Sequence, residues 1–207
     1  MVHIIGINGG SGSGKTSFTD KFATQLKNTG CTICLINGDW FYRATPDGVQ
    51  LSQWNWDTPA AFDFGPLITA IQAGVPTQLP GYDYVHHCSV PNQHPFTPNV
   101  DFLIIEGIML FNDEKLRDLI ETKIFVHTDL DACLARRILR DIVERGRTVQ
   151  SVISQWFETV KPGYEEFIFP TMKYSDVIFD NTKESIDQNI RRDNRLTQLI
   201  AQLNRRK

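Results

Sequence analysis

The segment Gly9-Gly10-Ser11-Gly12-Ser13-Gly14-Lys15-Thr16 determines the fold of this chain. It has the pattern G-x-x-x-x-G-K-T between an apolar run, 2–7, and a segment of helical periodicity, which is the strand–loop–helix setting of a phosphate-binding loop. Glycines let successive N–H groups point into one concavity, and the helix N-terminus adds partial positive charge. Lys15 can reach the outer phosphates, and the Thr16 hydroxyl can ligate Mg²⁺. Because a flexible Gly/Ser linker would not have these flanking elements, we expect a bound nucleoside triphosphate.

Around this loop, apolar runs alternate with segments of helical periodicity. The alternation predicts a mostly parallel sheet with helices on both faces, which is the three-layer α/β sandwich of phosphate-loop NTPases. Prolines and alternating aromatics in 77–99 predict a small β-hairpin flap, and about 141–165 is expected to form a helical lid. We expect a single domain over 1–207. The expected strands are 2–8, 31–36, 102–106, 123–127 and 176–179, and the expected helices are 15–27, 66–73, 130–144, 151–166 (broken near 161–163) and 185–203.

Composition argues against several classes of protein. A net charge of −3 over 207 residues argues against general nucleic-acid binding. The sequence has no run of about 18 apolar residues and no signal-peptide pattern at its start, so we expect a cytoplasmic protein without a membrane partner. Four cysteines are too few for a disulfide scaffold. Cys31 and Cys34 have C-x-x-C spacing, but strand alternation sends them to opposite sheet faces, which favours buried thiols over a redox or metal role.

Two carboxylates follow apolar strands, at the edge where parallel α/β sheets bind ligands. Glu106 ends the run 102–105, where it could hold Mg²⁺ directly or through water; the alternative is a surface residue at a strand end. Asp39 follows the strand 31–36. Its carboxylate could accept the proton of an attacking hydroxyl, help to hold Mg²⁺, or do both; the alternative is a helix N-cap.

Five arginines crowd the helix 130–144 and the residues after it: Arg136, Arg137, Arg140, Arg145 and Arg147. Phosphoryl transfer spreads negative charge over the phosphate oxygens, and guanidinium groups stabilise that charge. Gly146 could allow this part of the chain to close over the phosphates. The alternative is a solvated helix in which Asp141 pairs with arginines four residues away on either side.

Eight motifs follow one another along the chain: Gly9 to Thr16, Asp39-Trp-Phe-Tyr42, Asn55-Trp-Asp57-Thr-Pro-Ala-Ala-Phe62-Asp63, Tyr82-Asp-Tyr84-Val-His-His87, Glu106-Gly-Ile-Met-Leu-Phe111, Arg136-Arg-Ile-Leu-Arg140-Asp, Glu144-Arg-Gly-Arg147 and Lys161-Pro-Gly-Tyr-Glu-Glu-Phe-Ile-Phe-Pro170. Each motif is weak alone, but their joint order is highly specific. Over about residues 4–178 the chain resembles the uridine–cytidine kinases, in the branch of phosphate-loop kinases that also holds phosphoribulokinase and a pantothenate kinase.

The resemblance implies transfer of a phosphoryl group to the 5′-hydroxyl of uridine or cytidine, with Mg²⁺, with ATP as donor (GTP is the alternative donor), and by a homo-oligomer, a tetramer. It implies that Asp39, Lys15 and Arg140 are catalytic and that Thr16, Glu106 and Asp39 surround the metal. It adds Arg145 to the phosphate-binding loop as a ligand of ATP. The implied nucleoside site consists of Tyr42, Asp57, Tyr82, Tyr84, His87, Phe111, Arg137, Arg147 and Gln155, with Asp57 on the ribose 2′- and 3′-hydroxyls.

The chemistry of these residues agrees with a nucleoside. One carboxylate can accept two hydrogen bonds from a ribose diol, although Asp57 could instead form an Asx turn before Pro59. A flat pyrimidine suits aromatic walls and one histidine, although Tyr82, Tyr84 and His87 could also be ordinary hairpin residues.

Two other functions compete with this one. A kinase for ribulose 5-phosphate or pantothenate would share the donor half of the site, but a sugar phosphate calls for basic residues in the acceptor pocket, and 77–99 contains no Lys or Arg. A GTP-dependent switch would carry an Asn-Lys-x-Asp motif, which Asn181-Thr-Lys-Glu does not match. Supplying the different acceptors separates these functions.

Overall fold

The computed structural model describes residues 2–84, 86–182 and 196–205. Its centre is a five-stranded sheet in the order β2-β5-β1-β6-β7, and every neighbouring pair is parallel. The strands are β1 (His3–Asn8), β2 (Ile33–Asn37), β5 (Phe102–Gly107), β6 (Thr122–His127) and β7 (Val177–Asp180). The predicted parallel sheet is therefore confirmed.

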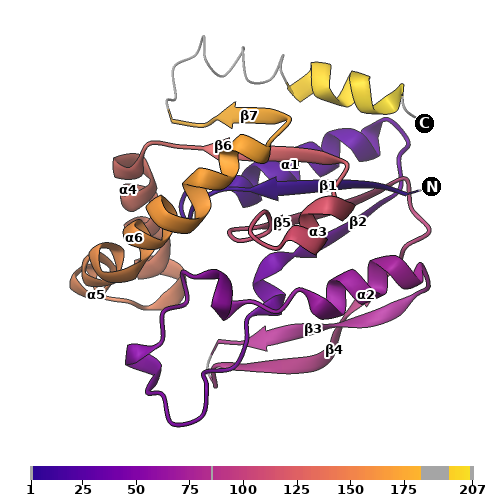
Figure 1. Cartoon of the computed structure of the whole chain (residues 1–207). Helices are drawn as coiled ribbons and strands as arrows, with labels where there is room; N and C mark the ends of the chain where they lie inside the picture. The colour runs from indigo at the N-terminus through magenta and orange to yellow at the C-terminus, as the bar shows by residue number, and fades with distance from the viewer. Residues whose placement is uncertain (1, 85, 183–195, 206–207) are drawn as a thin grey trace.

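Helices cover both faces of this sheet (Figure 1). Successive side chains of a strand point to opposite faces, so the apolar residues of β1 divide between two cores. Ile5 and Ile7 pack with α1 (Lys15–Asn28) and the helix 196–204. Ile4 packs on the other face with side chains of α2 (Gly65–Ala73) and α3 (Glu114–Leu119). The predicted three-layer sandwich is confirmed.

The phosphate-binding loop joins β1 to α1, as predicted. Gly12 and Gly14 have φ of 80° and 83°, a left-handed conformation that glycine adopts without strain. At Gly9 a Cβ would lie 2.6 Å from the carbonyl oxygen of Val126, so a side chain does not fit. Because α1 begins at Lys15, the positive end of the helix faces the loop.

The predicted flap at 77–99 is an antiparallel hairpin. Its strands are β3 (Thr77–Asp83) and β4 (Cys88–Phe96). The His94 ring stacks on Trp40, with 3.6 Å between ring centroids. Trp40 is the residue after Asp39, so this contact attaches the hairpin to the turn that carries Asp39.

The predicted helix break near 161–163 is wrong, because the chain remains helical over 149–174, here called the helical segment. Pro162 lacks an N–H and would clash with the carbonyl four residues earlier in a regular α-helix. A π-helical turn precedes it, in which the Lys161 N–H bonds five residues back to Trp156, and the widened helix accommodates the proline. The segment consists of α5 (Val149–Gln155), the π-turn Trp156–Val160, α6 (Lys161–Gly163), the π-turn Tyr164–Ile168 and the 3-10 turn Phe169–Tyr174.

Smaller differences concern the ends of elements. β2 begins two residues later than predicted, and α3, which Asp113 caps through the Leu116 N–H, has no counterpart in the prediction. Of the expected helix 185–203, residues 196–203 are helical and the rest lies outside the described residues. Cys31 and Cys34 are free thiols packed into opposite cores, as expected. Among the described helices, none is long and apolar enough to cross a membrane.

Candidate active site

An open pocket lies beside the phosphate-binding loop, lined by residues that follow β1, β2 and β5. The hairpin, α4 (Leu130–Arg145) and the helical segment complete its walls. Figure 1 shows α4 and the helical segment at the left-hand end of the sheet and the hairpin below the sheet, so the pocket is lined by parts of the chain that are far apart in the sequence. The lining residues are Ser11, Lys15, Asp39, Tyr42, Trp56, Asp57, Tyr82, Tyr84, His87, Ile108, Arg137, Arg140, Arg145, Arg147 and Gln155.

Beside the loop, Thr16 and Glu106 form a place that suits a metal ion. The Thr16 hydroxyl donates to Glu106 Oε1 at 3.3 Å, while Oε2 is buried with no hydrogen-bond partner among the described residues. Mg²⁺ takes few protein oxygens and completes its shell with phosphate and water, so an unpartnered carboxylate oxygen next to a hydroxyl fits it. The described part of the chain has no group of three His, Cys, Asp or Glu residues arranged for a metal.

Asp39 lies in the 3-10 turn Gly38–Phe41 that follows β2. The N-cap of this turn is Asn37, whose side-chain oxygen accepts from the Asp39 N–H at 2.8 Å. The capping role that Asp39 could have had is thus filled by Asn37, and Asp39 lines the pocket. Tyr42 and Tyr84 line the same pocket as Asp39. Burial raises the pKa of both phenols, and the negative charge of Asp39 raises it further.

Asp57 is 7% exposed and its carboxylate accepts from the Thr159 hydroxyl at Oδ2, at 2.9 Å. Burial raises the pKa of Asp57, whereas the Thr159 hydrogen bond and the charge of Arg137 lower it. The Asx turn in this segment is formed by Asn55, whose side-chain oxygen accepts from the Asp57 N–H at 2.9 Å. The Asp57 side chain therefore does not form the turn and lines the pocket instead.

Four arginines of the pocket surround Asp141, which is fully buried. The predicted i, i+4 pairs of Asp141 with Arg137 and Arg145 are present, but they are not on a solvated face, because Asp141 and Arg137 are buried. One carboxylate among four guanidinium groups leaves an excess of positive charge, which suits bound phosphates. The distances to the Asp141 oxygens are 3.5 Å for Arg137, 2.8 Å for Arg140, 3.5 Å for Arg145 and 3.7 Å for Arg147.

Gln155 and Ser11 tie the arginines to their surroundings. Gln155 Oε1 accepts from Arg137 Nη2 at 2.8 Å and also from Arg147 Nη1. Arg137 Nη1 donates to the Ser11 hydroxyl at 2.6 Å. Arg137 thus connects the helical segment to the phosphate-binding loop across the pocket.

Aromatic side chains form another part of the pocket lining. Trp56 stacks on His87 with 5.5 Å between centroids and meets Tyr42 edge-on at 5.8 Å. Tyr82 meets Tyr84 edge-on at 5.1 Å. Burial raises the pKa of Tyr82 to about 12, so its phenol keeps its proton at neutral pH. A wall of this kind offers both ring faces and hydroxyl donors to a flat polar ligand.

Most of the predicted nucleoside-site residues line the pocket, and Phe111 is the exception. It is fully buried in the core that contains α2 and α3, and its ring packs close to Gly6. Phe111 ends an apolar run, 108–111, that is buried throughout, so its ring does not reach the pocket. Of the phosphate-binding loop, Ser11 and Lys15 reach the pocket directly.

Sequence reasoning assigned no role in the site to three residues, Trp56, Ile108 and Thr159. Trp56 and Ile108 line the pocket, and both lie inside motifs that were otherwise used. Thr159 carries no signal in the sequence, since its partner Asp57 is 102 positions away. Asp141 is expected from the sequence to pair with arginines at i, i+4, but its contacts with Arg140 and Arg147 do not follow from that spacing.

The fold and the phosphate-binding loop together define the class of phosphate-loop kinases, and Lys15 and Asp57 line the same pocket. A family model described as "Phosphoribulokinase / Uridine kinase family" matches residues 4–186, and the chain belongs to this family.

Relatives and a solved structure agree with the family. The uridine kinase of Lactococcus lactis subsp. cremoris is 44% identical over 180 residues, covering 84% of this chain and 86% of the relative. A chloroplastic uridine/cytidine kinase of Arabidopsis thaliana is 42% identical over 180 residues, which cover 84% of this chain but only 37% of that protein. The D-glycerate 3-kinase structure from Cryptococcus neoformans has a TM-score of 0.61 at 19% identity, covering 89% of this chain and 88% of that one, and supports the fold alone.

Glu106→Gln is expected to raise the free energy of unfolding of the protein without metal or nucleotide by about 1 kcal/mol near pH 7. Burial raises the pKa of Glu106, and the charge of Lys15 opposes this. When the native-state pKa lies above the unfolded-state pKa, the native state binds more protons between these two values. The free energy of unfolding therefore falls as the pH rises from the unfolded-state pKa through the native-state pKa. Urea unfolding from pH 4 to 8 should therefore show a difference between variant and wild type that grows with pH. A variant less stable than the wild type at pH 7 would contradict this.

Proposed function

We propose that this chain transfers the γ-phosphoryl group of ATP to the 5′-hydroxyl of uridine and cytidine, with Mg²⁺. The observation that carries the proposal is one pocket lined by Lys15, Asp39 and Asp57, with aromatic side chains around Asp57. A triphosphate on the loop and a ribonucleoside on Asp57 would meet at Asp39. The names of the relatives described above support the same substrates.

In this proposal Asp39 is the base. Its carboxylate accepts the proton of the 5′-hydroxyl while that oxygen bonds to the γ-phosphorus and the bond to the bridging oxygen of ADP breaks. Lys15 and Arg140 stabilise the charge on the transferred phosphoryl oxygens, and Arg145 holds the triphosphate. Mg²⁺, held by Thr16, Glu106 and Asp39, would supply neutralisation of the phosphate charge.

The acceptor residues have complementary roles. The Asp57 carboxylate accepts hydrogen bonds from the 2′- and 3′-hydroxyls, because a carboxylate is an acceptor with about four lone-pair sites. Trp56 and Tyr42 enclose the base, and Tyr82, Tyr84 and His87 offer polar atoms to its edge. Arg137, Arg147 and Gln155, which line the same pocket, complete the nucleoside site.

An acceptor panel tests the proposal. Purified protein with ATP and Mg²⁺ is given uridine, cytidine, ribulose 5-phosphate or pantothenate, and ADP release is followed. We expect turnover with the two nucleosides and none above background with the other acceptors. Turnover of ribulose 5-phosphate or pantothenate without turnover of either nucleoside would assign the chain to another branch of the family.

Asp57→Ala is expected to lower kcat/KM for uridine by the equivalent of about 2–4 kcal/mol, because a charged hydrogen-bond acceptor is lost. The KM for ATP should change little, since the loop is untouched. Initial rates with each substrate varied in turn provide the comparison. If the wild type used uridine and 2′,3′-dideoxyuridine equally well, the assignment of Asp57 to the diol would be wrong.

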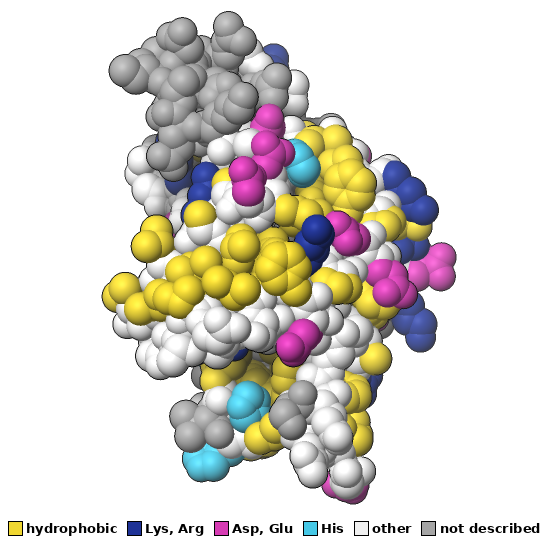
Figure 2. Space-filling view, turned by 90° about the vertical axis from the view of Figure 1, so that its left-hand side faces the viewer, with side chains coloured by type: hydrophobic (Ala, Val, Ile, Leu, Met, Phe, Trp, Pro, Cys, Tyr) yellow, Lys and Arg dark blue, Asp and Glu magenta, His cyan; other side chains and the backbone are white. Residues whose placement is uncertain are grey.

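We also propose a homo-oligomer, a tetramer by the family resemblance. Hydrophobic side chains form a band across the face that α4 and the helical segment present (Figure 2), and apolar bands of this kind favour association. Light scattering coupled to gel filtration measures the mass, and a value of 23.6 kDa would contradict the proposal. The exposed apolar residues here include Leu139, Ile142, Val143, Val149, Phe157 and Phe169.

A further inference from the structure

Thr159 makes the side-chain hydrogen bond that the Asp57 carboxylate accepts from the helical segment. Its hydroxyl oxygen lies 2.9 Å from Asp57 Oδ2 and 3.3 Å from the Gln155 carbonyl oxygen. A hydroxyl has one proton to donate, and the closer, charged acceptor forms the stronger bond. The proton is therefore directed to the carboxylate, which is nearly buried.

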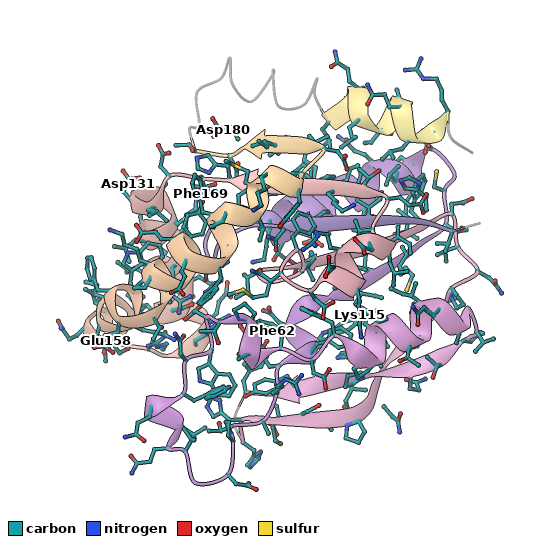
Figure 3. All side chains as sticks on the ribbon, viewed as in Figure 1. Phe62, Lys115, Asp131, Glu158, Phe169 and Asp180 are labelled. Atoms are coloured by element: carbon teal, nitrogen blue, oxygen red, sulfur yellow. The ribbon has the colours of Figure 1, made fainter. Side chains whose placement is uncertain are left out.

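The local helix geometry explains why a threonine reaches this carboxylate. Thr159 lies in the π-turn Trp156–Val160, and π-turns add a residue to the helical turn and so change which side chains share a face. Trp156 and Val160 are buried, whereas the neighbouring Glu158 is exposed and points outward (Figure 3). Thr159 in the same turn is half-buried, and its hydroxyl faces Asp57.

Gly163 permits the close approach of the helical segment to Asp57. A Cβ at Gly163 would lie 2.9 Å from the Asp57 Cβ and would collide with the Asp57 carbonyl oxygen. Glycine is therefore needed where the two stretches meet, and Thr159 is held one helical turn earlier. The contact is part of a packed interface and not a chance meeting of surface side chains.

Several other groups face Asp57, but none of them fixes its side chain in the same way. Asn55 holds the backbone N–H, Arg137 acts through its positive charge, and Asp39 acts through its negative charge. Among the described residues, Thr159 is the one whose side chain donates a hydrogen bond to the Asp57 carboxylate. It uses one acceptor site and leaves the other sites of the carboxylate for a ligand.

We propose that Thr159 is a positioning residue that holds the Asp57 carboxylate in the orientation required by a cis-diol, and thereby sets the preference for ribose over deoxyribose. This inference rests on the proposed function and adds a residue to it. Removing the hydroxyl should leave the phosphoryl-transfer step intact and weaken the use of the diol.

Thr159→Val and Thr159→Ser test the proposal, because valine keeps the shape and loses the hydroxyl, while serine keeps the hydroxyl. For Thr159→Val we expect KM for uridine to rise about tenfold, with kcat and KM for ATP within about twofold of wild type. The ratio of kcat/KM for uridine over 2′-deoxyuridine should fall about tenfold. Thr159→Ser should retain most of the wild-type ratio, and Glu158→Gln, on the outer face, should match the wild type.

Each outcome has a distinct meaning. A wild-type ratio in Thr159→Val, or an equal loss in the serine and valine variants, would overturn the role of Thr159 while leaving the proposed function in place. A wild type that does not phosphorylate uridine would overturn the proposed function itself. If valine impairs folding, as judged by circular dichroism, Thr159→Ala gives the same comparison, with serine as the rescue.

Discussion

Asp39→Asn is expected to lower kcat with uridine by about 10²-fold or more, because an amide cannot accept the proton of the 5′-hydroxyl. The substitution keeps the shape of the side chain, and the backbone bond from residue 39 to Asn37 is unaffected. ATP affinity should remain largely intact, since Lys15 and the loop glycines are unchanged. Steady-state rates and titration calorimetry with ATP measure the two effects separately.

Asp63→Asn is the matched control for this variant. Asp63 is a half-exposed carboxylate that pairs with Arg43 at 3.5 Å, away from the lining of the pocket. Its substitution should change kcat by less than about twofold, as surface ion pairs contribute little. A kcat near that of the wild type in Asp39→Asn would remove Asp39 from the proton transfer.

Asp141→Ala is expected to lower the free energy of unfolding by about 3–5 kcal/mol. The side chain is fully buried, and its loss leaves Arg137 buried without the carboxylate that pairs with it. Arg140, which lies 2.8 Å from the same carboxylate, would lose its ion pair as well. Urea unfolding followed by circular dichroism gives the free energy, and a second effect should appear as weaker binding of ATP, because the arginines lose their common anchor.

Glu144→Ala is the control on the same helix. Glu144 is exposed near the end of α4, so its removal should change stability by less than about 0.5 kcal/mol. If Asp141→Ala were as stable as Glu144→Ala, the four arginines would not depend on Asp141 for their arrangement.

Features that depend on local sequence could be predicted. Phe102 to Ile105 is a continuous apolar run, which is typical of a parallel strand buried on both faces, and Gly9 to Thr16 has residues that suit few other structures. The carboxylates Asp39 and Glu106 could be placed near each other because parallel strands end at one edge of the sheet. The hairpin at 77–99 could be predicted from its alternation and prolines.

Features that depend on contacts between residues far apart in the sequence could not be predicted. Pro162 predicts a break, but the chain continues through two π-turns, and Tyr164 and Ile168 of the second turn pack into the core. Phe111 belongs to a motif of the site, yet its ring fills the core because the whole run after β5 is buried. The pair of Asp57 and Thr159 depends on a close helix approach at Gly163, and no spacing in the sequence encodes that approach.

The central claim is that the phosphate-binding loop and Asp57 hold the two substrates of a single transfer to a nucleoside 5′-hydroxyl. The most direct measurement uses ATP labelled with ³²P at the γ-position, Mg²⁺ and uridine, with separation of the nucleotide products. We predict that the label appears in uridine 5′-monophosphate in an amount equal to the ADP formed. Release of the label as inorganic phosphate, or its retention in ATP when uridine is present, would contradict the claim.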